Sequence, residues 1–422
     1  MIDGLKPYPR MKDSGVPWLG EVPEHWEVPR LGALLRERGE NNEGGYVTDV
    51  LSVTRDRGVI PYAEKGNIGN KMSDDITRYK IVRPDDIVVN CMNVIIGSVG
   101  LSRYTGCLSP VYYVLTRRSE HDDPRYLNAY FQTKPFQESL VRIGNGILAH
   151  RMRIPLELLK SELFPRPPAD EQAAIVRFLD HADRRIRRYI RAKQKLIKLL
   201  EEQKQAIIHQ AVTGRIDVRT GQPYPAYKNS GVEWLGEVPA HWEVVPLRWY
   251  ISIGSGDFIA AEAVSPVPNA QSAVPIIGGN GIMGYGANSN TDGMTIVIGR
   301  VGALCGNVHL VTGQAWVTDN ALRVTRMKGF EPEYLALQLR TSNLNRLANA
   351  NAQPLITGAV VKEQRVVRPQ REDQRRIVRD VSEATVEVDA SIGNITREVA
   401  LIREYRTRLI ADVVTGKLDV RE

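Results

Sequence analysis

The chain contains nearly the same fifteen residues twice. "SGVPWLGEVPEHWEV" at Ser14–Val28 returns as "SGVEWLGEVPAHWEV" at Ser230–Val244, an offset of 216. A second block repeats at an offset of 202: it opens with "DEQAAIVRFLD" from Asp170 or "EDQRRIVRDVS" from Glu372, and it closes with "TGRIDVR" or "TGKLDVR". The order is block A, insert 1, block B, then block A, insert 2, block B. A scaffold that is present twice predicts two copies of one fold.

The two inserts, about 30–168 and 246–370, differ far more than the blocks around them. They share faint echoes. "VIIGSVG" at Val94–Gly100 resembles "IVIGRVG" at Ile296–Gly302 at an offset of 202, and "PRYL" resembles "PEYL" at an offset of 208. Strand-like runs and one helix-like segment in each insert predict an α+β fold with loops of different length. Diverged inserts on a repeated scaffold are typical of a molecule that recognises two different targets.

Composition is that of an ordinary globular protein. The 422 residues, 42% hydrophobic and 25% charged, suffice for two or three domains. A net charge of +7 and a pI near 9.2 favour a nucleic-acid partner without requiring one. Three cysteines lie in unrelated contexts, the N-terminus has no signal-peptide pattern, and no apolar run is long enough to span a membrane. We therefore expect a cytoplasmic protein.

Block B predicts a long helix in each copy. Asp170–Val212 contains no proline or glycine, and apolar or small residues recur at alternating spacings of four and three, as in a coiled coil. Asp170 is the expected N-cap, Gly214 is expected to follow the helix end, and Gly393 is expected to kink or weaken the second helix. The expected seam positions are Ile175, Leu179, Ala182, Ile186, Tyr189, Leu196, Leu200 and Ile207, and then Ile377, Val381, Ala384, Val388, Ile395, Ile402, Tyr405 and Leu409.

Neither helix can bury its apolar stripe alone, so we expect the two to pair antiparallel and to act as a spacer. The alternative is a bundle that dimerises the protein. The basic run Arg184–Lys198 is interpreted as a solvated helix face, or else as a surface for phosphates or a partner. In block A, Trp18 and Trp26 are expected to pack. His25 and His241 are interpreted as packing residues too, because no cysteine or aspartate is paired with them in sequence.

The loops of both inserts are rich in asparagine, arginine, lysine and histidine. Asparagine can form two hydrogen bonds with adenine, and arginine or lysine with guanine, in the major groove of DNA. Any one of these residues can equally be a turn residue or a phosphate contact. The candidate DNA-binding residues are Arg55, Arg57, Lys65, Asn67, Lys71, Asn90, Asn93, Arg103, His150, Arg151, Asn280, Asn288, Asn290, Arg300, Asn307, His309 and Asn320.

Catalytic motifs are missing from the sequence. "RPPA" at Arg166 does not fit the [DNS]PP[YFW] pattern of amino-base methyltransferases, and no GxxxxGK[ST] phosphate loop occurs. "PDD" at Pro84 has no ExK nearby to complete a nuclease metal site, and HExxH and GxSxG are absent. We therefore expect a protein with no catalytic residues and no metal site of its own.

Taken together, these features resemble the specificity subunit of type I restriction–modification systems, the HsdS family. The doubled "SGVxWLGEVPxHWEV", followed by "PPADEQAAIVRFLD" opening a helix that ends in "TGRID", carries the resemblance over nearly the whole chain. "GRVGALCGNVHLVTGQAWVTDNALRV" at Gly299–Val324 is also similar to the target-recognition domains of that family. The second helix departs mildly from the pattern, with "REDQRRI" in place of "ADEQAAI".

The resemblance implies an α+β fold, in which two pseudo-twofold-related α/β target-recognition domains are joined by two long antiparallel coiled-coil helices. The expected boundaries are 1–168 and 217–370 for the two target-recognition domains, and 169–216 and 371–422 for the two conserved spacer helices. On this interpretation block A occurs twice because each DNA reader needs the same attachment to the same scaffold.

The resemblance also implies a function. The chain would read a bipartite, asymmetric site in double-stranded DNA and direct two methylation subunits and two restriction subunits to it. S-adenosylmethionine, ATP and Mg would be bound by those partners, so this chain is expected to carry no cofactor. Two alternatives come from other classes. One is a fused methyltransferase or nuclease, against which the missing motifs argue, and the other is a two-domain protein-binding scaffold without DNA readout.

Overall fold

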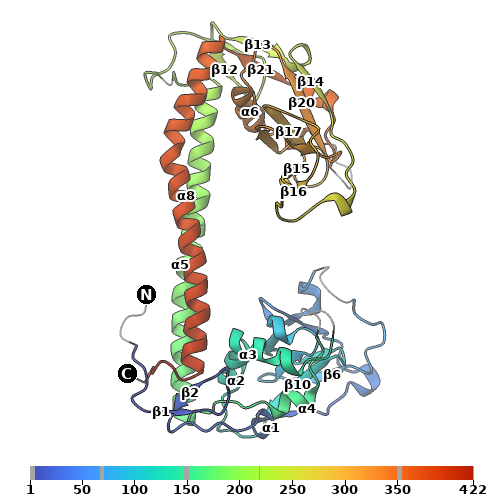
Figure 1. Ribbon diagram of the computed structural model, residues 1–422, viewed down its shortest axis with the longest axis vertical. Helices are drawn as coiled ribbons and strands as arrows, with labels where there is room; N and C mark the ends of the chain where they lie inside the picture. The colour runs from blue at the N-terminus through green and yellow to red at the C-terminus, as the bar shows by residue number, and fades with distance from the viewer. Residues whose placement is uncertain (1–4, 67–70, 147–151, 218, 349–353, 422) are drawn as a thin grey trace. The chain divides into compact units, whose positions relative to one another are not determined.

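A computed structural model describes residues 5–421 except 67–70, 147–151, 218 and 349–353 (Figure 1). The chain divides into two compact units. Unit 1 comprises residues 1–193 and 397–422, and unit 2 comprises residues 194–396. Each unit therefore contains one block A, one insert, and a part of both long helices.

Unit 1 is built on an antiparallel four-stranded sheet with the order β3-β10-β7-β8, accompanied by the strand pairs β1–β2, β4–β5 and β6–β9. Its strands are β1 (Met11–Asp13), β2 (Glu21–Pro23), β3 (Leu35–Glu37), β4 (Leu51–Thr54), β5 (Gly58–Pro61), β6 (Lys80–Val82), β7 (Ile87–Asn90), β8 (Val99–Leu101), β9 (Gly106–Leu108) and β10 (Tyr112–Arg117). Its short helices are α1 (Leu31–Leu34), α2 (Pro124–Phe131), α3 (Lys134–Ser139) and α4 (Leu156–Ser161). Aromatic side chains of α2 and α3, among them Tyr130 and Phe136, are fully buried in its core.

Unit 2 has an equivalent four-stranded sheet with the order β14-β20-β17-β18, together with a three-stranded sheet β16-β15-β19 and the pairs β11–β12 and β13–β21. Its strands are β11 (Tyr227–Asn229), β12 (Glu237–Pro239), β13 (Glu243–Pro246), β14 (Ile251–Ser255), β15 (Val274–Gly278), β16 (Gly281–Gly286), β17 (Thr295–Gly299), β18 (Val308–Val311), β19 (Trp316–Val317), β20 (Ala321–Met327) and β21 (Arg365–Arg368). Its short helices are α6 (Pro332–Thr341) and α7 (Gly358–Lys362). The expected α+β class is confirmed.

The sheet order shows which parts of the inserts correspond. β7 and β17 occupy the same position in their sheets, and the helices α2 and α6 each follow the last strand of their sheet. In both cases the residue numbers differ by about 208. The echo at an offset of 202 is therefore misleading: Val94–Ile96 is a 3-10 turn before β8, whereas Thr295–Gly299 is β17 itself. Short apolar runs that end in glycine are common beside turns, so their likeness does not fix which strands correspond.

The two long helices are α5 (Ala169–Val212) and α8 (Arg371–Val414), and they lie side by side (Figure 1). α5 begins one residue before the expected N-cap Asp170, and α8 continues through Gly393 without a break. They run antiparallel in each unit. In unit 1, Asp183 pairs with Arg406 at 2.6 Å and Lys193 with Glu398 at 2.9 Å; in unit 2, Lys204 pairs with Asp389 at 2.6 Å.

Burial along the expected seam is uneven. Ile175, Ala182 and Ile186 are buried in the core of unit 1, and Ile377 and Val381 in the core of unit 2. Seam residues farther from the globular parts are more exposed, with Tyr189 at 41% and Leu196 at 40%. Two helices alone cover a narrow stripe, so away from the inserts burial varies from one seam position to the next: Val388 is only 8% exposed there.

Each long helix ends against a block A. The backbone N–H groups of Gly214 and Arg215 donate to the carbonyls of Ala211 and Gln210 at 3.2 and 2.9 Å, and Gly416 and Lys417 end α8 in the same way. This left-handed Schellman ending requires glycine, because φ is +71° at Gly214 and +78° at Gly416. A Cβ at Gly416 would also lie 2.3 Å from Cδ of Pro23. The repeated blocks A and B thus form one locking contact, made once in each unit.

The start of each long helix differs between the copies. In unit 1 the buried carboxylate of Glu171 accepts hydrogen bonds from the Tyr8 hydroxyl and from Trp26 Nε1 at 3.0 Å, and it lies 2.8 Å from His25 Nε2. In unit 2 the equivalent residue is Asp373, which is shorter by one methylene. The indole N–H of Trp242, the counterpart of Trp26, is buried there without a hydrogen-bond partner.

Candidate functional site

Polar residues of insert 2 gather along the edge of the unit 2 sheet that is formed by the ends of its strands. β14 and β17 end at this edge and β18 and β20 begin there, because Gly299 is paired with Ala321, Ile298 with Val308, and Ser255 with Leu322. The tight turn between β15 and β16 reaches the same edge: a Cβ on Gly279 would lie 3.3 Å from the carbonyl of Asn320. We name the polar group there the edge cluster; it consists of Ser255, Asn280, Arg300, Asn307 and Asn320.

The edge cluster holds its side chains through weak contacts with one another. Asn307 Nδ2 donates to Asn280 Oδ1 at 3.5 Å, and Arg300 Nη1 donates to Ser255 Oγ at 3.3 Å. The side chains of Asn280 and Asn320 are exposed. Arg300 forms no ion pair among the described residues, and its Nε is buried without a partner. The cluster therefore offers amide and guanidinium groups that are positioned but still able to bond a ligand, which are the groups that recognise base edges.

His309 lies behind this edge. It is half-buried, and its ring is 3.5 Å from the position that a Cβ would take on Gly281. Burial, and then the positive charge of Arg340, lower the pKa of His309, while a hydrogen bond with the backbone of Gly279 opposes the shift. A neutral imidazole bonded to the hairpin turn supports the position of Asn280, and it is poorly suited to neutralise a phosphate.

The other two candidates in insert 2 lie apart from the edge cluster. Asn290 is fully engaged inside unit 2: its Nδ2 donates to Asp257 Oδ2 and to the carbonyl of Val317, both at 2.8 Å, and its Oδ1 accepts from the N–H of Val317 at 2.7 Å. Asn288 is exposed and lines a pocket of about 470 Å³ together with Phe258 and Trp316.

In unit 1, Asn90 is the last residue of β7 and Asn93 lies in the turn that follows, the counterpart of the turn after β17. Asn90 Oδ1 accepts from the N–H of Met92 at 3.0 Å, so this side chain shapes the turn. The N–H of Ile154 donates to the carbonyl of Cys91 at 2.9 Å, as that of Ile356 does to Arg300 in unit 2. The two units therefore present equivalent edges, and that of unit 1 includes two candidate residues.

The basic candidates of insert 1 are not gathered with Asn90 and Asn93. Arg55 and Arg57 are exposed on the turn between β4 and β5, where Arg57 donates to the carbonyl of Glu64 at 2.5 Å. Arg103 follows the far end of β8, since Leu101 is paired with the first residue of β7. Lys65 lies over the Tyr62 ring at 4.9 Å, and Lys71 is exposed. Asn67, His150 and Arg151 lie outside the described residues.

Exposed apolar side chains beside the edge cluster were not predicted from the sequence. Ile282 is 61% exposed, Met283 56% and Leu304 48%. An apolar residue in a strand or next to one is ordinarily assigned to the core. The signal that could have identified these residues is the "GGNGIMGYG" hairpin, where a Gly-Asn turn is followed by two consecutive apolar residues rather than by alternation.

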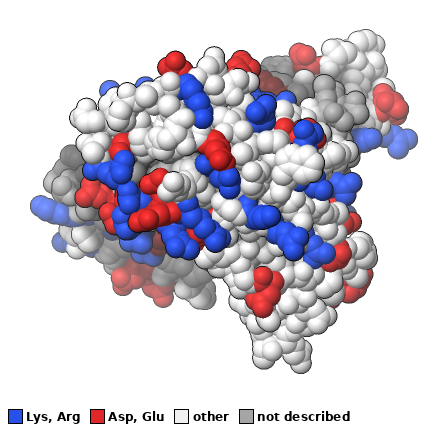
Figure 2. Space-filling model, turned by 90° about the horizontal axis from the view of Figure 1, so that it is seen from above, with Lys and Arg blue, Asp and Glu red and all other residues white. Residues whose placement is uncertain are grey.

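Surface charge is mixed. On the face drawn in Figure 2, Lys and Arg side chains form short runs between Asp and Glu side chains and broad uncharged areas. In the basic run of α5, Arg187 pairs with Asp183 at 2.5 Å and Lys193 pairs with Glu398, while Arg185, Arg188 and Arg191 are exposed. Such a surface can attract a polyanion but discriminates little by charge, so specificity has to come from placed side chains.

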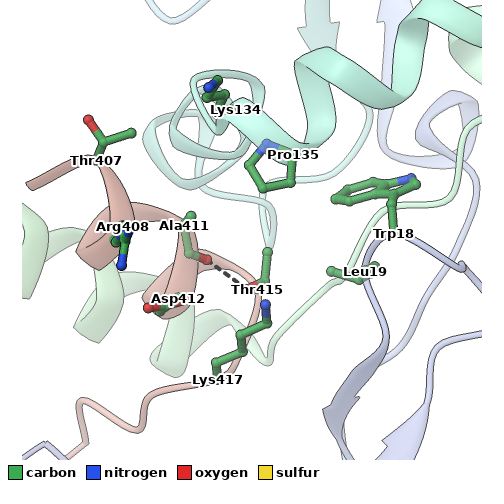
Figure 3. Close-up of a pocket in the computed structure, with 10 residues that line it drawn as sticks. All are labelled: Trp18, Leu19, Lys134, Pro135, Thr407, Arg408, Ala411, Asp412, Thr415 and Lys417. Carbon is green, nitrogen blue, oxygen red and sulfur yellow. Dashed lines mark hydrogen bonds between the residues drawn. The ribbon is translucent and has the colours of Figure 1, made fainter. Parts of the chain in front are cut away.

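A small pocket in unit 1 marks another difference between the copies (Figure 3). It encloses about 220 Å³ between the block A residues Trp18 and Leu19, the start of α3, and the end of α8 at Ala411. The residue that corresponds to Ala411 in unit 2 is His209. That side chain is half-buried, and it is hydrogen-bonded with the backbone of Trp234. The pocket is therefore open where the repeat carries a small residue.

Within the described part of the chain, no group of three or more potential ligands could hold a metal ion. No helix among those residues is long and apolar enough to cross a membrane.

Comparison with known proteins links this geometry to a family. No protein-family model matches the chain. The EcoprrI type I restriction enzyme specificity subunit of Escherichia coli is 30% identical over 160 residues, which cover 38% of this chain and 39% of that protein. The MjaVIII type I restriction enzyme specificity subunit of Methanocaldococcus jannaschii is 25% identical over 244 residues, 56% of this chain and 52% of that protein. The chain thus matches about half or less of these relatives' lengths.

The fold is shared more widely than the sequence. A chain from a solved structure that concerns the complex assembly and conformational transition of the type I R-M system aligns with a TM-score of 0.64 at 15% identity, over 93% of this chain and 98% of that chain. At this identity the likeness establishes the fold. The resemblance to type I specificity subunits that the repeated blocks indicate is confirmed.

Proposed function

We propose that this chain is the specificity subunit of a type I restriction–modification complex. The observation that carries the proposal is a scaffold given twice, with the same helix-end contact in each unit, supporting two inserts that share a sheet order but little sequence. Two different readers on one scaffold suit a bipartite, asymmetric DNA site, since a palindromic site requires matching readers.

In this role the chain recognises DNA and its partners perform the chemistry. Methylation and restriction subunits would bind S-adenosylmethionine, ATP and Mg, and this chain would direct them to the site. The missing catalytic motifs in the sequence support a protein without catalysis of its own. We place it in the cytoplasm, where DNA is accessible. The paired helices α5 and α8, which both contribute to the two units, are the proposed spacer.

Each unit is proposed to read one half-site through its sheet edge. In unit 2 the reader is the edge cluster, and in unit 1 it is the turn after β7, with the other candidates of insert 1 supplying phosphate contacts. Phosphate contacts fix the register of a protein on DNA, whereas base contacts specify the sequence.

Exchanging one insert tests this proposal. Residues 246–370 are replaced by the corresponding insert of another specificity subunit, the chimera is expressed with its methylation subunit, and the modified sites are mapped in the host genome. We expect one half-site to change and the other to persist, because each unit contains one complete insert. A matched chimera with residues 30–168 replaced should change the opposite half-site. If both half-sites changed together in either chimera, the modular interpretation would fail.

A further inference from the structure

Three exposed apolar side chains lie within three residues of one or the other asparagine of the pair Asn280 and Asn307 in the edge cluster. Ile282 and Met283 follow Asn280 on β16, and Leu304 precedes Asn307 in the turn between β17 and β18. Scattered apolar residues are common on protein surfaces, but a contiguous group around placed polar side chains marks an interaction site.

The backbone brings this group together. The N–H of Asn307 donates to the carbonyl of Leu304 at 3.2 Å, so both residues belong to one turn. Asn307 reaches across to Asn280 in the β15–β16 hairpin at 3.5 Å. The register of that hairpin shifts between Ile276 and Ile277, which accommodates two consecutive exposed residues on β16.

The hydrogen-bonding capacity of Asn280 is only partly used. Its Oδ1 accepts one contact from Asn307 and keeps a second lone pair, while both N–H groups of its own amide have no partner among the described residues. An amide in this state can donate to N7 and accept from the N6 amino group of adenine at the same time. Asn307 would act on the base through Asn280, as a positioning residue.

We propose that Asn280, with Ile282, Met283 and Leu304 beside it, reads an A·T base pair in the major groove. This inference rests on the proposed DNA-reading function. The amide bonds adenine, and the apolar side chains contact the C5-methyl group of thymine. An A·T pair presents an adenine edge and a methyl group side by side, whereas a G·C pair presents no methyl. The amide and apolar groups together match the first of these surfaces.

Uracil substitution tests the apolar part of the contact, because uracil differs from thymine only by that methyl. The chain is co-purified with its methylation subunit, and its site is selected from random duplexes. Each thymine of the selected site is then replaced by uracil in synthetic duplexes, and affinities are measured by fluorescence anisotropy. At one thymine we expect about a three- to fivefold loss for the wild-type chain, the effect of removing one buried methyl.

Substitutions test which side chains contact the thymine methyl and which contact the adenine. The double variant Ile282→Ala/Met283→Ala should bind the thymine duplex more weakly and should no longer distinguish uracil at that position. Leu304→Ala should reduce the distinction, and Asn280→Ala should abolish the preference for adenine in the same pair. Val267→Ala removes an apolar side chain that is 63% exposed elsewhere in insert 2, and it should respond to uracil like the wild type.

The outcomes separate this inference from the proposed function. If selection from random duplexes yielded no preferred sequence, both the A·T contact and the proposed specificity role would be contradicted. Specific binding with no uracil effect at any thymine, or with the same effect in the wild type and the double variant, would overturn the A·T contact and leave the specificity role intact. So would loss of co-purification with the methylation subunit in the double variant at unchanged DNA selectivity, because the apolar group would then be a protein-binding surface.

Discussion

One methylene distinguishes the two carboxylates that open the long helices. Glu171 reaches the Trp26 indole and the Tyr8 hydroxyl. In unit 2, where the shorter Asp373 takes the equivalent position, the indole N–H of Trp242 is buried without a partner. A buried donor without an acceptor costs about 1–3 kcal/mol of stability. The second copy of the scaffold therefore lacks a hydrogen bond that the first copy forms, and a longer side chain at position 373 could restore it.

We expect Asp373→Glu to stabilise unit 2 by about 1 kcal/mol, because the longer side chain can accept from Trp242 Nε1. Thermal unfolding and the indole N–H resonance of Trp242 would show the change. The matched control is Glu171→Asp, which shortens the reach to Trp26 and should destabilise unit 1 by a similar amount. If Asp373→Glu left both the unfolding temperature and the resonance unchanged, the two sites would not be equivalent.

The half-buried imidazole of His309 should make unit 2 sensitive to acid. Burial and Arg340 lower its pKa in the folded chain, so the unfolded chain, with a pKa near about 6.5, binds a proton more readily. Stability is therefore complete above about pH 6.5 and falls as the pH drops below that value. Hydrogen exchange of the β15–β16 hairpin between pH 8 and 5.5, corrected for intrinsic rates, measures the effect. His309→Gln should flatten the profile, and His121→Gln, at an exposed position of unit 1, should not.

At the residue scale, the sequence predicts which residue types could contact bases more readily than where the fold places them. The types of Asn280, Arg300, Asn307 and Asn320 mark them as possible base contacts, but only the strand register brings them to one edge. The bonds that engage Asn290 come from residues 27 and 33 positions away in the chain. Local sequence does not contain such pairings. The DNA-binding role of every candidate remains a prediction.

Among the elements, the long helices were the most predictable. Their period, their length and the glycines at their ends are local properties, and α5 and α8 are present where expected. The antiparallel pairing followed from the need to bury an apolar stripe. Which strands of the two sheets are equivalent was harder to predict from the sequence. Loops of different length change the repeat offset from 202 in the helices to about 208 in the inserts. A short echo such as Val94–Gly100 cannot show that shift.

Gly393 inside α8 and Gly416 just after its end should respond oppositely to alanine. Gly416→Ala introduces a side chain at a φ of +78° and 2.3 Å from Pro23, so we expect unit 1 to lose about 2 kcal/mol or more. Gly393→Ala meets nothing within 4 Å in the middle of a helix, and it should stabilise that helix by about 0.5–1 kcal/mol. Urea unfolding followed by tryptophan fluorescence compares the two. Equal effects of the two substitutions would contradict the locking contact between block A and the helix end.

On the scale of the whole molecule, the two units differ in how many segments of the chain form them. Unit 2 is one uninterrupted stretch, 194–396, whereas unit 1 combines 1–193 with 397–422. The core of unit 1 includes Leu409, Val413 and Val414 of α8, and the Tyr126 hydroxyl donates to the carbonyl of Val414 at 3.0 Å. Residues 397–422 are thus part of unit 1.

A chain that stops after Thr396 should therefore retain a folded unit 2 and a weakened unit 1. Loss of Leu409, Val413 and Val414 uncovers the core around Trp26 and Tyr126, and burial of three such side chains stabilises by several kcal/mol, at about 1.5–3 kcal/mol each. Hydrogen exchange mapped over both units would show rapid exchange in 31–117 and native protection in 274–327. Equal loss of protection in the two units would contradict this division.

The same division sets an order of events during synthesis. Residues 1–193 of unit 1 leave the ribosome before unit 2, but Leu409, Val413 and Val414, which complete the core of unit 1, are translated after unit 2. All of unit 2 emerges in between and can fold before the chain is finished. Throughout that interval unit 1 exposes the apolar surface that α8 will cover, and exposed apolar surface on an incomplete chain favours aggregation.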